Sequence, residues 1–110
     1  ESILYESVGV VDVSHNQLTS FEGLEDNSYF TLYVYANPLD YTNSSVIDFL
    51  NKTSIDTLYT DYGSNLEKIT FTDDFSELRI VGGDKKVIEL FPESIDVETV
   101  EEDEVRTLLW

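Results

Sequence analysis

The sequence predicts an α/β fold: a short right-handed solenoid with a parallel sheet on one face, closed at its C-terminal end by a β-rich cap. Two observations lead to this prediction. The first half of the chain repeats one pattern of apolar residues and asparagines, and the part after residue 66 changes to short strand-like segments separated by turn residues. We expect residues 1–66 to form about three coils, and residues 67–110 to form the cap and an acidic tail of the same domain.

The repeat places apolar residues and an asparagine at fixed offsets. The first copy is Val8, Val11, Val13, Asn16 and Leu18, and the second, 21 residues later, is Tyr29, Leu32, Val34, Asn37 and Leu39. A degenerate third copy follows after 26 residues, with Ile55, Leu58, Thr60, Gly63, Asn65 and Leu66. Alternation within each copy predicts a short strand with one buried face. Asn16 and Asn37 then follow a strand and can bond the backbone of the turn and of the neighbouring coil, which predicts an asparagine ladder.

The longer second repeat leaves room for a helix, and the end of the chain favours strands. Asn43 or Ser44 can cap a helix whose inward residues are Val46, Ile47, Phe49 and Leu50. Leu66, Ile69 and Phe71 could add one more strand to the sheet. Strands at 78–81 and 86–91, with Gly82, Gly83 and Asp84 between them, predict a hairpin as the cap. Residues 93–106 carry seven acidic residues against Arg106 alone and are expected to be a solvated, partly flexible tail, and the apolar residues 107–110 could dock.

The repeat pattern resembles that of leucine-rich repeat proteins, whose repeats run about 20–29 residues. The resemblance covers roughly residues 8–66. With its short repeats that end in asparagine and its lack of Cys, the chain is most similar to bacterial cell-surface repeat proteins of the internalin type. The resemblance implies a protein-interaction module that uses its sheet face, although the repeats here are few and irregular. The alternative is that both copies are ordinary alternating strands of an unrelated α+β domain.

Composition excludes several classes of function. The chain has 23 acidic and 6 basic residues, a net charge of −17, and no basic residue before Lys52. Such a field repels nucleic acid and anionic membranes, and no apolar run is long enough to insert into a bilayer. There is no Cys, so disulfides and thiolate sites are excluded. An extracellular Cys-free domain is more typical of bacteria, and a start at Glu1 fits either a processed protein or a trimmed chain.

Catalysis and metal binding are not expected. Asp12, Ser14 and His15 have the residue types of a hydrolase triad, but neighbouring strand residues point to opposite faces. His15 is interpreted as a turn residue, and we expect no catalytic residue and no cofactor. Residues 73–74 and 101–104 are acidic but contain no calcium-loop spacing, so no metal is expected. Residues 43–45 and 51–53 are glycosylation triplets, which matter only in a eukaryotic secretory setting.

A candidate binding surface follows from the residues between the buried ones. In register they form three columns: Val10–Thr31–Thr57, Asp12–Tyr33–Tyr59 and Ser14–Tyr35–Asp61, with Lys68, Thr70 and Thr72 on a possible fourth strand. We predict protein binding through Asp12, Ser14, Thr31, Tyr33, Tyr35, Tyr59 and Asp61. Tyrosines give large contact area at low entropy cost, and the acids favour a basic partner. The competing interpretation is that these residues reflect strand propensity and packing alone.

Three non-enzymatic functions therefore stay open. The first is adhesion or recognition by a bacterial cell-surface or secreted protein. The second is an intracellular leucine-rich repeat scaffold in the cytoplasm. The third is a purely structural cap or spacer of a larger protein. Enzymatic activity ranks last and would be revived by turnover that depends on His15.

Overall fold

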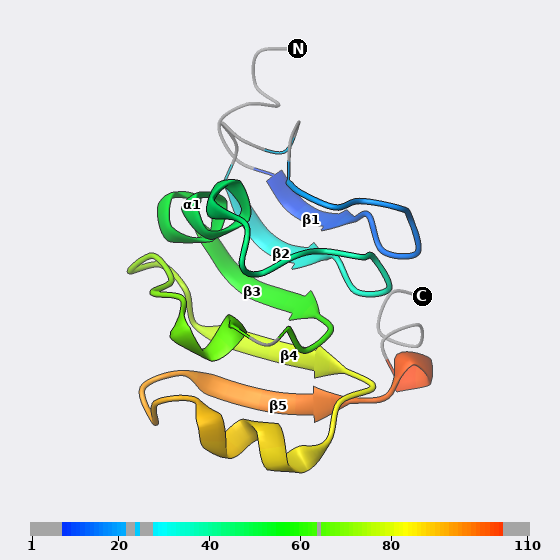
Figure 1. The fold of residues 1–110 in the computed structure, drawn as a ribbon, viewed down its shortest axis with the longest axis vertical. Coiled ribbons are helices and arrows are strands. Elements are labelled where there is room, and N and C mark those ends of the chain that lie inside the picture. Colours follow the sequence, from blue (N-terminus) through cyan, green and yellow to red (C-terminus); the bar gives the residue numbers. More distant parts are fainter. Residues whose placement is uncertain (1–7, 22–23, 25–27, 64, 105–110) are drawn as a thin grey trace.

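The computed structural model describes residues 8–21, 24, 28–63 and 65–104 (Figure 1). Its elements are five strands, one α-helix and two 3₁₀ helices. In chain order they are β1 (Val8–Asp12), β2 (Tyr29–Tyr33), α1 (Ser44–Lys52), β3 (Ile55–Thr60), η2 (Leu66–Lys68), β4 (Glu77–Val81), η3 (Lys85–Leu90) and β5 (Asp96–Val100).

The five strands form one parallel sheet in the order β1-β2-β3-β4-β5, so that strands adjacent in the chain are also adjacent in the sheet. In Figure 1 the arrows of all five strands point the same way, as the parallel pairing requires. The predicted α/β class and parallel sheet are confirmed. The predicted register is confirmed as well, because Val10 pairs with Thr31 and Thr31 with Thr57.

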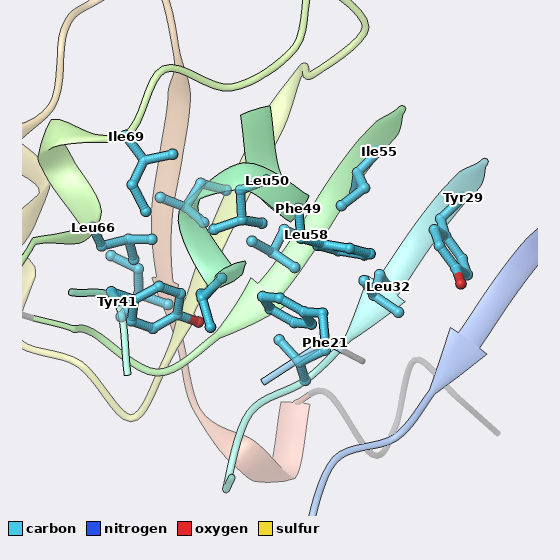
Figure 2. Packing of buried hydrophobic residues seen from close by; sticks show 14 of the residues in the cluster. Phe21, Tyr29, Leu32, Tyr41, Phe49, Leu50, Ile55, Leu58, Leu66 and Ile69 are labelled. Atoms are coloured by element: carbon cyan, nitrogen blue, oxygen red, sulfur yellow. The ribbon is translucent and has the colours of Figure 1, made fainter. Parts of the chain in front are cut away.

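One face of the sheet carries the main core. The row Val11–Leu32–Leu58–Leu78–Val97 is in register across all five strands, and its three leucines are fully buried. Figure 2 shows Phe21, Phe49 and Leu50 packed over this face, with the Phe21 and Phe49 rings stacked at 4.3 Å. Burial of each such leucine stabilises the fold by about 1.5–3 kcal/mol, so this row fixes which face of every strand points inward.

Helix α1 forms as predicted. Asn43 Oδ1 accepts a hydrogen bond of 2.8 Å from Ser45 N, which satisfies a free donor of the first turn. Val46, Phe49 and Leu50 are buried against the sheet and Ile47 is half-buried. The helix ends at Lys52, a basic residue in the last turn.

The predicted hairpin after residue 66 is wrong. Residues 85–90 form η3, and β4 pairs in parallel with β5 instead of antiparallel with residues 86–91. Asp84 caps η3 by accepting from Lys86 N at 2.9 Å, and Val87, Ile88 and Phe91 pack on the core. Their spacing of one and three residues suits a helical turn better than a strand, in which alternate residues share a face.

The possible fourth strand at Leu66–Phe71 is wrong for the same reason. Residues 66–68 form η2, and Leu66 and Ile69 are buried three residues apart. The fourth strand is β4, so Lys68, Thr70 and Thr72 do not join the predicted columns. Glu77, Arg79 and Val81 of β4 continue these columns instead. The sheet therefore continues beyond residue 66.

The expected solvated tail is wrong over residues 96–100, which form β5. Val97 is buried while Asp96 and Glu98 are exposed, an alternation typical of a half-buried strand. The high acidic content hides this pattern in the sequence. Residues 105–110, including the apolar end that could dock, lie outside the described residues. Among the described helices, none has the length and apolar character needed to cross a membrane.

Candidate binding face of the sheet

The face of the sheet opposite the leucine row carries the residues predicted for binding. Two rows run in register across it: Val10–Thr31–Thr57–Glu77–Asp96 and Asp12–Tyr33–Tyr59–Arg79–Glu98. We call these two rows, with Tyr35, Val81 and Val100 beyond them, the tyrosine face. The structure thus brings the predicted columns of the first three strands together, and it adds a charged half from β4 and β5.

The tyrosine half is a packed cluster. Tyr33 and Tyr59 stack with ring centroids 4.3 Å apart, and Val81 packs with them. Tyr33, Tyr35 and Tyr59 keep only 6%, 2% and 8% of their surface exposed. Rings buried to this extent mainly stabilise the fold by packing, and little of their surface is accessible to a partner.

The environment of Tyr33 keeps its hydroxyl neutral. Burial is the largest cause, followed by Tyr59 and then by the carboxylate of Asp12, and together they raise the pKa of Tyr33 from 10.0 to about 12. A phenolate in this place would be desolvated and close to a carboxylate. Tyr33 therefore keeps its hydroxyl proton while it is stacked in this cluster.

The charged half is organised around Arg79. Its guanidinium contacts the Glu77 carboxylate, lies 3.4 Å from Asp96 Oδ2 and 3.8 Å from Glu98 Oε2, and is 12% exposed. Nη1 of Arg79 also donates to the Asp96 carbonyl at 3.2 Å. Of the charged residues in the two rows, four are carboxylates and one is this guanidinium, so the rows keep a net negative charge.

Among the other predicted residues, Asp12, Ser14 and Asp61 make hydrogen bonds at the ends of the strands. Asp12 Oδ1 accepts from Ser14 N at 3.0 Å and also from the Ser14 hydroxyl. Asp61 Oδ2 accepts from Ala36 N at 2.6 Å, and Ala36 has a left-handed backbone with φ of 60°. Thr31 is buried. Of the predicted set, Asp12 alone is fully exposed.

The asparagine at the end of β2 makes the backbone bonds that its position predicts. Asn37 Oδ1 accepts from Asn16 N at 3.0 Å and from Leu18 N at 3.2 Å. Its Nδ2 donates to Val13 O at 3.0 Å and to Val34 O at 2.9 Å. Asn16 differs, because among the described residues its Nδ2 donates to carbonyls of its own turn, Val13 O at 2.7 Å and Ser14 O at 3.1 Å. The ladder thus joins the first two strand ends mainly through Asn37.

The residue types of a hydrolase triad do not form a relay here. The Ser14 hydroxyl donates to Asp12, while His15 Nε2 lies 2.6 Å from Glu102 Oε2. His15 therefore faces away from the Asp12–Ser14 pair and toward the segment after β5. Nor do the described residues include a group of three or more His, Asp or Glu side chains arranged to hold a metal ion.

Two features of this face escape sequence reasoning: the Arg79 cluster and the contact between His15 and Glu102. The strand predicted at 78–81 is β4, but Asp96 and Glu98, which approach Arg79 from the neighbouring strand, belong to β5, a strand that the acidic composition hides. Nothing local in the sequence links residue 15 with residue 102.

Two open hollows lie around the loop before β5, with volumes of about 580 and 470 Å³. Pro92, Ser94 and Ile95 line both of them. Neither hollow includes a residue of the predicted binding set.

Comparison of the chain with protein-family models, with curated proteins and with solved structures finds no match.

Proposed function

We propose that the chain is a non-enzymatic protein-interaction module of the leucine-rich repeat type, part of a bacterial cell-surface or secreted protein, and that it binds a basic partner through the tyrosine face. The observation that carries the proposal is the net negative charge held in register on one face of a rigid parallel sheet. A rigid face of this kind orders few groups on binding, which lowers the entropic cost of association.

The repeat character is supported by the spacing of equivalent strand positions. Val10, Thr31, Thr57, Glu77 and Asp96 are paired in turn, which gives steps of 21, 26, 20 and 19 residues. These steps match the usual leucine-rich repeat length or fall just below it. Three of the five strands, β1, β2 and β4, also end in a similar bend: His15, Ala36 and Gly82 all have positive φ, four residues after Val11, Leu32 and Leu78 of the core row. Such regularity favours a solenoid.

The exposed part of the face defines where a partner would bind. Val10 is 57% exposed, and Asp12, Asp96 and Glu98 are exposed at the ends of the two rows. Lysine and arginine side chains fit this rim, with Val10 as an apolar contact. Rim charges mainly accelerate encounter and lose strength in salt, so binding should weaken as ionic strength rises.

The test is a crosslinking capture from candidate partner extracts, followed by affinity measurement on the captured protein. The test variant is Asp12→Asn/Asp96→Asn/Glu98→Gln, and the control is Asp48→Asn/Glu89→Gln/Glu93→Gln, which removes the same charge from α1, η3 and the loop before β5. Three exposed charges predict roughly five- to ten-fold weaker binding for the test variant and no change for the control. Equal binding by both variants would place the site elsewhere.

A structural spacer is the second candidate, and the burial of Tyr33, Tyr35 and Tyr59 favours it. In that case every interaction of the parent protein survives both triple variants. These variants are better probes than truncation of the tyrosines, because alanine at three packed rings would disturb the fold itself.

A further inference from the structure

The chain after β5 turns back toward the end of β1, the strand at the other edge of the sheet. Residues 101–104 form a single turn, in which Glu104 N donates to Glu101 O at 3.0 Å. In Figure 1 this turn, drawn in orange-red, lies beyond the carboxyl ends of the strands, on the side of the loops that follow β1 and β2. From there Glu102 Oε2 approaches His15 Nε2 to 2.6 Å. The contact links the loop after the first strand with the turn after the last.

His15 is at the same time placed over a tyrosine of the candidate face. Its ring meets Tyr35 edge-on, with centroids 5.3 Å apart and an interplanar angle of 81°. Tyr35 is only 2% exposed. Val100, the last residue of β5, packs against the same cluster. The strand end, the turn after it and His15 therefore converge on one end of the tyrosine face.

We infer that His15 and residues 101–104 form an internal cover over the Tyr35 end of the tyrosine face, held closed by the ion pair between His15 and Glu102. For the partner of the proposed function, on which this regulatory role rests, the cover has to open before Tyr35 becomes part of the contact. While His15 holds the Glu102 carboxylate, this carboxylate is not available to a cation of the partner. A basic partner can therefore compete directly with His15.

The ion pair between His15 and Glu102 is weak enough for a partner to displace. The side chains of His15 and Glu102 are 47% and 38% exposed, so the ion pair is well solvated. Exposed pairs change an equilibrium roughly two- to five-fold. The expected effect of breaking the pair is an increase of this size in the accessibility of Tyr35, with the rest of the fold intact.

Hydroxyl-radical footprinting of the full chain at about pH 6, a range in which histidine side chains carry charge, measures this accessibility. The variants are Glu102→Gln, His15→Asn and their combination, with Glu101→Gln as a control that removes one charge from the same turn. Asn is chosen because His15 has φ of 59°, a conformation that Asn tolerates. The exposed Tyr62 and the core residue Tyr41 serve as internal references.

The inference predicts that oxidation of Tyr35 rises roughly two- to five-fold in both single variants. In Glu101→Gln the oxidation of Tyr35 should stay unchanged, and the oxidation of Tyr62 and Tyr41 should stay unchanged in every variant. The double variant should increase the oxidation of Tyr35 by less than the two single effects combined, because both changes remove the same ion pair. No increase at Tyr35, additive effects, or a parallel increase at Tyr41 would overturn the cover. Footprinting needs no partner, so its failure overturns the cover alone, whereas equal capture by the two charge variants overturns the binding role alone.

Discussion

Asn37 shows how one side chain can hold two strand ends together. Its amide makes four backbone bonds of 3.2 Å or less, and three of them reach the segment from Val13 to Leu18. These groups lie at a bend, where the sheet ladder no longer serves them, and Asn37 supplies partners to both the N–H groups and the carbonyls there. Asn16 is also an asparagine at the equivalent position of the repeat, but within the described part of the chain its side chain bonds carbonyls of its own turn.

We therefore predict that Asn37→Ala lowers the free energy of unfolding by about 2–3 kcal/mol, because it leaves half-buried backbone groups unpaired. Asn16→Ala should cost about 1 kcal/mol or less. Urea denaturation of the two variants measures the difference. Equal losses would mean that the ladder bonds add nothing beyond the turn.

Tyr33 should make stability depend on pH at the alkaline end. Its folded-state pKa of about 12 lies above the ordinary 10.0, chiefly because of burial and next because of Tyr59. The unfolded chain therefore loses this proton first, and the contribution is complete below pH 10 and lost as pH rises toward about 12.

The matching variant is Tyr33→Phe, which keeps the ring and removes the titrating group. Between pH 10 and 12 its stability should fall less steeply than that of the parent, by at most about 1.4 kcal/mol per pH unit, the slope of one proton. Some slope will remain, since burial also raises the pKa of Tyr41. Denaturation curves across this range measure it, and identical slopes would contradict the assignment.

At the scale of elements, Gly63 explains why the third copy of the repeat lacks its asparagine. A Cβ at this position would lie 2.0 Å from Cδ2 of Tyr41, whose buried ring precedes α1 and whose hydroxyl contacts Thr60 Oγ1. The Tyr41 ring thus occupies the space beside the bend after β3. The longer connection through α1 replaces an asparagine bond with an aromatic ring.

We predict that Gly63→Ala destabilises the fold by about 2–3 kcal/mol, because a packed ring cannot move without strain. Gly9→Ala is the control, since a Cβ there meets no atom within 4 Å. That change should be neutral or stabilising by up to about 1 kcal/mol. Thermal or urea unfolding distinguishes the two, and a neutral Gly63→Ala would show that Tyr41 shifts freely.

The elements also show where sequence reasoning succeeds and fails. Strands β1 to β3 and helix α1 were predictable, because alternation, the 21-residue repeat and the Asn43 cap are local signals. Strand β5 was missed because acidic residues surround its apolar ones. The hairpin prediction failed at η3, since the sequence VIELF contains apolar residues that suit either a strand or a helical turn.

At the scale of the whole molecule, one sheet separates two unlike surfaces. The leucine face holds the main core under α1 and the connections, while the opposite face combines a tyrosine cluster with an acidic half. The net charge of −17 on a molecule of 42 × 32 × 27 Å causes electrostatic repulsion, which lowers the stability of the folded state. The Arg79 cluster relieves part of this repulsion, because it places a guanidinium among three carboxylates.

The sequence by itself determined the α/β class, the first three strands with their register, the helix and the role of Asn37. The strands and the helix depend on local periodicity, which fixes which side is buried, while the register and the role of Asn37 follow from the recurrence of one pattern along the chain. Only the tertiary structure decided that the sheet continues through β4 and β5, that the predicted tyrosines are buried, and that His15 meets Glu102. Burial of a strand residue depends on what covers its face, and a contact between residues 15 and 102 depends on how every intervening strand stacks. Neither quantity is encoded in a local pattern.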